Sequence, residues 1–131
     1  MTTDEKLKQE QADEEMISQA FDHLLKSYLT SKHRKKVEII TKAFNFAKQA
    51  HKGVKRRSGE PYIMHPIAVA QIACSEIGLG STSICAALLH DVVEDTDYTV
   101  EDIENLFGPK VAQIVDGLTK ISGGIFGDRA S

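Results

Sequence analysis

The sequence predicts an all-α protein, a bundle of about six helices joined by short connections. Apolar residues repeat at intervals of three and four through most of the chain, the period of a helix that is buried on one face. No segment alternates apolar and polar residues in the manner of a strand. The 131 residues are enough for one domain with a real core and too few for two.

Apolar stripes predict the first two helices. One stripe runs through residues 16–28, namely Met16, Ile17, Ala20, Phe21, Leu24, Leu25 and Tyr28. A second stripe predicts a helix from about Arg34 to His51 that stops near Gly53. The polar, acid-rich residues 1–15 precede both stripes, and we expect them to be flexible. A charged loop with turn residues follows the second helix, over residues 55–61.

Proline, glycine and hydroxyl residues mark the third and fourth helices. The dipeptide His65-Pro66 opens a helix that continues to Ile77, because proline suits the first helical position. Ser81 or Thr82 is expected to cap a fourth helix over about 84–93. This helix is almost wholly apolar before its last turn, so we expect it to run through the middle of the fold.

The last two helices are predicted from their ends. Thr99 and Asp102 resemble a capping box, which predicts a short fifth helix ending at Phe107-Gly108. Pro109 then begins a sixth helix, whose inward residues are expected to be Val111, Ile114, Val115 and Leu118. Residues 122–131 show no helical period and are expected to form a linker-like tail.

Composition excludes several classes of function. The formal net charge of -3 argues against a dedicated nucleic-acid binder, which normally carries a basic excess. The sequence has neither a signal peptide nor an apolar run long enough to span a membrane, so we expect a cytoplasmic protein. Cys74 and Cys85 lie in apolar segments without CxxC spacing and are interpreted as buried hydrophobic residues.

The most informative segment is the string His90-Asp91-Val92-Val93-Glu94-Asp95, which closes the apolar fourth helix. At 100° per residue, the histidine and the three acids fall on one face of that helix. Carboxylates are disfavoured at a helix C-terminus, where the macrodipole is negative, and a divalent cation would relieve the conflict. The alternative is a solvated acidic helix end beside a satisfied histidine.

His65 is expected to join this face if the third and fourth helices pack antiparallel, as their short connection favours. A site of imidazole nitrogen and carboxylate oxygen suits Mn²⁺, Fe²⁺ or Zn²⁺ and disfavours Ca²⁺. Such an ion favours hydrolysis of a phosphate ester. Glu94 and Asp95, one turn beyond His90 and Asp91, are then candidates to orient or deprotonate the attacking water, or to support the ligands.

The loop residues Arg56, Arg57 and Ser58 are candidates for binding a phosphorylated nucleotide. Arginine forks pair with phosphate oxygens and stack on bases, and the hydroxyl and exposed amides of such a loop add donors. Taken without the acidic string, a solvated basic loop would be the simpler interpretation.

These motifs together resemble the RelA/SpoT homologues, over about Lys35 to Lys120. The chain is similar to the N-terminal part of their HD-type hydrolase domain, a helical bundle. Four segments carry the resemblance in the family's order: Ala50–Gly53, Arg56–Pro66, Ala86–Thr96 and Val115–Lys120. One HD pair is weak evidence, whereas four linked motifs at fitting separations are specific.

The resemblance implies a Mn²⁺-dependent guanosine-3′,5′-bis(diphosphate) 3′-pyrophosphohydrolase acting on the alarmones ppGpp and pppGpp in the stringent response. It implies that His65, His90 and Asp91 bind the metal and that Glu94 and Asp95 serve catalysis. The residues Arg56, Arg57 and Ser58 would hold the nucleotide, with Arg56 against guanine. The position after Arg56 is more often lysine in the family. The intact HDxxED string favours an active or bifunctional relative.

The resemblance also implies a longer protein, a GTP pyrophosphokinase or bifunctional enzyme, because the family's fourth metal ligand lies beyond the matched stretch. Residues 1–131 are then one domain truncated at the C-terminus, with little activity alone. An apolar flank left exposed on the fourth helix would favour self-association. Two alternatives stay open: an inactive nucleotide-binding or regulatory HD module, and an HD phosphohydrolase of another nucleotide.

Overall fold

The structure is a computed structural model that describes residues 2–31 and 36–125, and these residues form six helices and one isolated β-bridge. The all-α prediction is therefore confirmed. The helices are α1 (Thr3–Leu29), α2 (Val37–Ala50), α3 (Met64–Ser75), α4 (Ser81–Asp95), α5 (Val100–Phe107) and α6 (Pro109–Ile125). No helix in the described part of the chain is long and apolar enough to cross a membrane.

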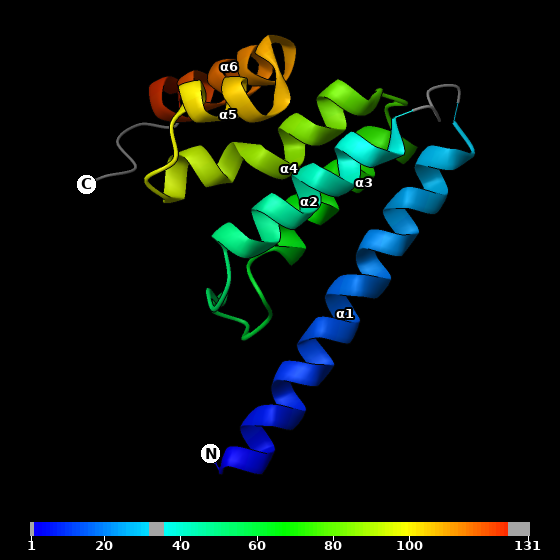
Figure 1. The fold of residues 1–131 in the computed structure, drawn as a ribbon, viewed down its shortest axis with the longest axis vertical. Coiled ribbons are helices and arrows are strands. Elements are labelled where there is room, and N and C mark those ends of the chain that lie inside the picture. The colour runs from blue at the N-terminus through cyan, green and yellow to red at the C-terminus, as the bar shows by residue number, and fades with distance from the viewer. Residues whose placement is uncertain (1, 32–35, 126–131) are drawn as a thin grey trace.

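Helix α4 lies in the middle of the bundle, between the α5–α6 pair and the layer of α2 and α3 (Figure 1). It contacts α2, α3 and α6, so every side of its apolar segment is covered. All six residues from Ile84 to Leu89 are buried. The central position is confirmed, and the expected exposed apolar flank is absent from this segment. The N-cap prediction was wrong, because the helix begins at Ser81 with Gly80 as its cap residue.

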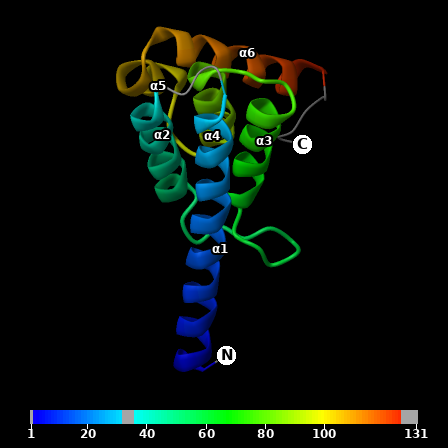
Figure 2. The ribbon, with the colours of Figure 1, turned by 90° about the vertical axis from the view of Figure 1, so that its right-hand side faces the viewer.

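Helix α1 begins at Thr3, so most of the segment expected to be flexible is helical. The Thr2 side chain accepts a hydrogen bond from the Glu5 amide at 3.2 Å, and acidic residues in the first turn suit the positive end of the helix dipole. The N-terminal turns project beyond the bundle (Figure 2). Five residues of α1 are buried: Asp13, Ile17, Phe21, Leu24 and Tyr28.

Helices α5 and α6 pack on each other at one end of the bundle (Figure 1). The predicted capping box of Thr99 and Asp102 is present. On α6, Val111 and Val115 are buried, but Leu118 is exposed and was wrongly predicted to face inward. An apolar stripe on a helix is buried only where other helices pack against it. The prediction of a linker-like tail over residues 122–131 was also wrong in part, because α6 continues to Ile125. A helix that has formed propagates through residues of low helix propensity. The rest of the predicted tail, residues 126–131, lies outside the described residues.

The loop between α2 and α3 is closed by backbone hydrogen bonds (Figure 2). The Tyr62 amide donates to the Val54 carbonyl at 2.9 Å, and the Arg56 amide donates to the Glu60 carbonyl at 2.9 Å. Gly59 has φ = 91°, a conformation that favours glycine and turns the chain at the loop tip. We call residues 54–62 the basic loop. It behaves as a small hairpin rather than as an unstructured connection.

Candidate metal and nucleotide site

The structure places both His65 and His90 near Asp91. His65 lies in the first turn of α3, and His90 and Asp91 lie in the last turns of α4. The His90 Nε2 atom is 3.2 Å from Asp91 Oδ1, and the His65 Nε2 atom is 3.9 Å from Asp91 Oδ2. The start of α3 thus meets the end of α4, as expected for helices packed antiparallel. The carboxylate of Asp91 is the centre of the group.

His90 is held in one orientation by its own helix. Its Nδ1 atom lies 2.9 Å from the carbonyl oxygen of Ala87, a contact that requires the proton on Nδ1. The Nε2 atom is then the ring nitrogen that faces Asp91. An imidazole nitrogen beside a carboxylate oxygen is a donor set for a divalent transition-metal ion.

Asp91 is the buried carboxylate of the site, with 6% of its surface exposed. Its Oδ2 atom accepts a hydrogen bond from the Tyr62 hydroxyl at 3.1 Å. Burial raises the pKa of Tyr62 far above its usual range, and the negative charges of Asp91 and Asp95 raise it further. The phenol therefore stays protonated at neutral pH and remains a donor to Asp91.

Glu94 lies close to the same group. His90, Asp91 and Glu94 each offer one ligand atom, and these atoms lie within 4.8 Å of one another. Atoms that bind one ion at about 2.0 to 2.2 Å lie roughly 3.0 to 4.3 Å apart, and the 3.2 Å from His90 Nε2 to Asp91 Oδ1 falls in this range. His65 is not part of this group, and its Nε2 atom approaches the other carboxylate oxygen of Asp91. Asp95 is exposed on the last turn of α4. The four residues of the HDxxED string thus differ in burial although they share one end of the helix.

His51 is a buried neighbour that sequence reasoning did not single out as a site residue. It caps the end of α2, is 4% exposed, and its ring centroid is 4.8 Å from that of Tyr62. Its Nε2 atom has no hydrogen-bond partner among the described residues. Burial lowers the pKa of His51, against the opposing charges of Asp91 and Asp95. The imidazole is therefore neutral at pH 7.

Tyr62 was also missed as a site residue. The sequence feature that could have identified it is its position three residues before His65, just ahead of a helix. From this position an aromatic side chain with a hydroxyl can reach Asp91, the residue that His65 also approaches. The ring centroids of Tyr62 and His65 are 6.1 Å apart. Tyr62 also closes the basic loop through its amide, so the loop and the acidic cluster meet at this residue.

The predicted nucleotide-binding residues Arg56, Arg57 and Ser58 are exposed at the turn of the basic loop. The guanidinium of Arg56 pairs with Glu60 at 2.9 Å inside the loop. The loop therefore presents charged and hydroxyl groups to solvent from a backbone that is held at its base. The structure places these groups on the segment that leads directly into Tyr62 and His65.

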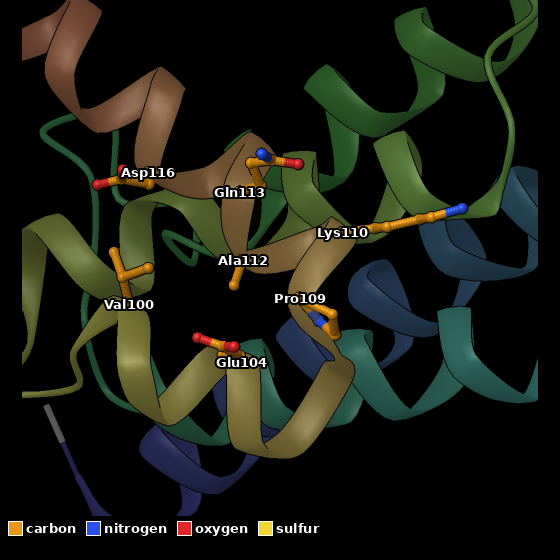
Figure 3. Close-up of a pocket in the computed structure, with 7 residues that line it drawn as sticks. All are labelled: Val100, Glu104, Pro109, Lys110, Ala112, Gln113 and Asp116. Atoms are coloured by element: carbon orange, nitrogen blue, oxygen red, sulfur yellow. The ribbon is translucent and has the colours of Figure 1, made fainter.

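A groove lies away from the acidic cluster. An open groove of about 330 Å³ is formed between α5 and α6 (Figure 3). Its lining residues come from these two helices: Val100, Glu104, Pro109, Lys110, Ala112, Gln113 and Asp116. The groove is separate from the acidic cluster, which is built on α3 and α4.

Comparison with known proteins identifies the fold family. The HD domain family matches residues 43–124, and the chain belongs to this family. The matched stretch contains the basic loop, His65 and the whole HDxxED string.

The chain is also similar to curated proteins named as hydrolases or synthases of (p)ppGpp. It is 48% identical over 93 residues to the guanosine-3′,5′-bis(diphosphate) 3′-pyrophosphohydrolase of Aquifex aeolicus, covering 71% of this chain and 13% of that protein. It is 43% identical over 105 residues to the bifunctional (p)ppGpp synthase/hydrolase SpoT of Escherichia coli, covering 80% and 14%. The chain therefore spans about a seventh of the length of these relatives.

A solved structure is also similar, that of a metazoan ortholog of SpoT that hydrolyzes ppGpp and plays a role in starvation responses. The TM-score is 0.57 at 38% sequence identity, and the match covers 60% of this chain and 46% of the other. The likeness thus extends from sequence to the arrangement of the helices.

The burial of His51 predicts a pH dependence of stability. Because folding lowers the His51 pKa, the unfolded chain binds a proton at pH values where the folded chain does not, and stability falls as the pH drops through about 6.5. In His51→Gln, the free energy of unfolding should therefore fall less between about pH 7.5 and about pH 5 than it does in the wild type. Denaturant unfolding at several pH values measures this difference.

The control is His23→Gln, which changes an exposed histidine on α1. This variant should keep the pH dependence of the wild type. Equal slopes for His51→Gln and the wild type would contradict the assignment of a neutral, buried His51.

Proposed function

We propose that this chain is the hydrolase region of an enzyme that removes the 3′-pyrophosphate of ppGpp and pppGpp. The observation that carries the proposal is the cluster of His90, Asp91 and Glu94 at the end of α4, with His65 Nε2 3.9 Å from Asp91 Oδ2. The names of the relatives support the choice of substrate. The reaction adds water to the phosphorus attached to the 3′ oxygen, which leaves with a proton, so the products are pyrophosphate and GDP or GTP.

The residues present fit a divalent metal ion. His65 and His90 offer imidazole nitrogens, Asp91 offers carboxylate oxygens, and the contact from His90 Nδ1 to the Ala87 carbonyl leaves Nε2 free to bind. This mixed donor set suits Mn²⁺, the ion that the resemblance implies. When bound, such an ion lowers the pKa of water and neutralises charge on phosphoryl oxygens.

Glu94 and Asp95 are proposed to handle the protons. Glu94 lies in the cluster with His90 and Asp91, and Asp95 follows it on the exposed end of α4. A carboxylate in this position can accept the proton of the attacking water, and a neighbouring acid can return one to the leaving 3′ oxygen. Tyr62 holds Asp91 through its hydroxyl and so limits the motion of the central ligand.

The basic loop is proposed to bind the nucleotide. Arg56 would stack on guanine, and Arg57 and Ser58 would donate to phosphate oxygens. Arg56 now pairs with Glu60, an exposed ion pair of small net stability that the nucleotide can displace. The placement of the loop next to His65 supports one continuous site for base and pyrophosphate.

The location is proposed to be cytoplasmic, where guanine nucleotides are available, with no role in nucleic-acid binding. Two other functions would give different results in binding and turnover experiments. An inactive binding module would bind ppGpp without turnover. A phosphohydrolase of another nucleotide would turn over a substrate without the 3′-pyrophosphate.

Metal binding is tested by titration. His90→Gln removes the oriented Nε2 donor, and the Mn²⁺ affinity should fall by about 10-fold or more, as expected for loss of a ligand. Isothermal titration with MnCl₂ measures the affinity, and circular dichroism checks that the helices persist. The exposed-histidine variant His23→Gln should bind like the wild type. The ligand assignment fails if both variants bind Mn²⁺ equally well.

Catalysis is tested by isosteric neutralisation. Glu94→Gln and Asp95→Asn should each reduce hydrolysis by about 10²-fold or more, with fold and Mn²⁺ binding nearly unchanged, because they remove charge rather than volume. Release of pyrophosphate from ppGpp is measured in this chain and in the longer enzyme that the resemblance implies. Glu101→Gln, an exposed change on α5, is the matched control. Unchanged turnover in both site variants would remove these acids from the mechanism.

Nucleotide binding is tested in the basic loop. The double variant Arg56→Ala/Arg57→Ala should weaken ppGpp binding by about 1.5 to 3 kcal/mol per lost charge-assisted contact, and the remaining binding should depend less on salt. Stability should change little because both side chains are exposed. Lys6→Ala/Lys8→Ala removes the same charge from exposed positions on α1 and is the control. Equal affinity in both double variants would show that the loop is only solvated surface.

A further inference from the structure

Asp13 occupies a position where an apolar residue is expected. The buried stripe of α1 runs through Ile17, Phe21, Leu24 and Tyr28, and one helical turn before Ile17 its next member is Asp13. This residue is 7% exposed. A charged group at a buried position is costly unless it is paired, so its partners explain why it is there.

Both carboxylate oxygens of Asp13 are engaged. Oδ1 accepts a hydrogen bond from Gln9 Nε2 at 2.9 Å, and Oδ2 accepts one from Lys55 Nζ. The pairing with Lys55 holds the pKa of Asp13 below its usual range. The neighbouring acid, Glu14, makes a different ion pair: it contacts Lys48 on α2 at 2.6 Å. Asp13 and Glu14, which are adjacent in α1, thus form ion pairs with two different segments, the basic loop and α2.

Lys55 belongs to the base of the basic loop. Its backbone pairs with Pro61 across the loop, between the hydrogen bond that joins Tyr62 to Val54 and the one that joins Arg56 to Glu60. Tyr62 in turn donates to Asp91. The base of the loop is therefore fixed from two sides, by α1 through Asp13 and by the acidic cluster through Tyr62.

We propose that Asp13 is a positioning residue for nucleotide binding: through Lys55 it orders the basic loop, so that Arg56, Arg57 and Ser58 are presented in a binding conformation. A loop that is already ordered loses less conformational entropy when it binds a ligand. The ordering of the basic loop by Asp13 does not depend on the proposed function, whereas its effect on nucleotide affinity rests on that function.

A simpler role would be to dock α1 on the bundle, and one substitution separates the two roles. Asp13→Leu continues the apolar stripe, so it keeps or improves the packing of α1 while it removes the partner of Lys55. Asp13→Asn removes the charge with little change in volume. Glu14→Gln breaks the neighbouring ion pair, which does not reach the basic loop, and serves as the matched control.

The first measurement is hydrogen exchange of the amides of residues 54–62 in the intact chain without nucleotide. Asp13→Leu and Asp13→Asn should speed this exchange by about 10-fold, with helices α2 and α4 protected as in the wild type. Glu14→Gln should leave the loop unchanged. Exchange in the loop at the wild-type rate in both Asp13 variants would overturn the proposal.

The second measurement is ppGpp affinity, at a temperature where thermal melts show all variants folded. Both Asp13 variants should bind ppGpp about 3- to 10-fold more weakly than the wild type and than Glu14→Gln, whatever the change in melting temperature. Wild-type affinity in a variant with a loosened loop would overturn the positioning role. If the wild type itself does not bind ppGpp, the proposed function fails, and the exchange experiment still decides whether Asp13 orders the loop.

Discussion

The buried carboxylate of Asp91 is the constraint on which the site and much of the packing depend. A carboxylate shielded from water is costly unless donors or cations surround it. In this protein the surrounding groups come from three places: His90 on the same helix, His65 on α3 and Tyr62 at the end of the basic loop. The contacts from His65 and Tyr62 require that the start of α3 lie against the end of α4. The antiparallel packing of these two helices satisfies this requirement.

The helix that carries Asp91 is a suitable base for a metal site because it is enclosed. Residues Ile84–Leu89 are buried between α2, α3 and α6, so the last turns of α4 project from a well-packed segment. His90 is fixed further by its contact with the Ala87 carbonyl. Ligands on a rigid element keep their separation when the ion is absent, which favours binding.

The two chemical tasks of the proposed enzyme are placed on different kinds of structure. The proposed metal ligands and catalytic acids lie on helix ends, where spacing is fixed, whereas the proposed nucleotide-binding groups lie on an exposed loop. An exposed loop can change its conformation to fit a ligand, but it needs anchors that keep it at a fixed position relative to the helix ends. Tyr62 and Lys55 supply these anchors, toward Asp91 and Asp13 respectively. Helix α1 thereby contributes to the site although none of its side chains belongs to the acidic cluster.

The sequence by itself determined the class of the fold and the approximate place of the six helices in the described residues, and it predicted the donor set. Helical period, the capping box at Thr99 and the HDxxED string are local features, and they predict structure because neighbouring residues on one helix are fixed relative to each other. The pairing of His65 with the end of α4 also followed, since a short connection favours antiparallel packing.

Only the tertiary structure decided which polar groups are buried and what they contact. Asp13, His51 and Tyr62 look ordinary in the sequence, because burial and partners depend on segments far away along the chain. The same reason explains why Leu118, a member of an apolar stripe, is exposed. A period of 3.6 residues says which side chains share a face, but only the packed neighbours decide how much of that face is covered.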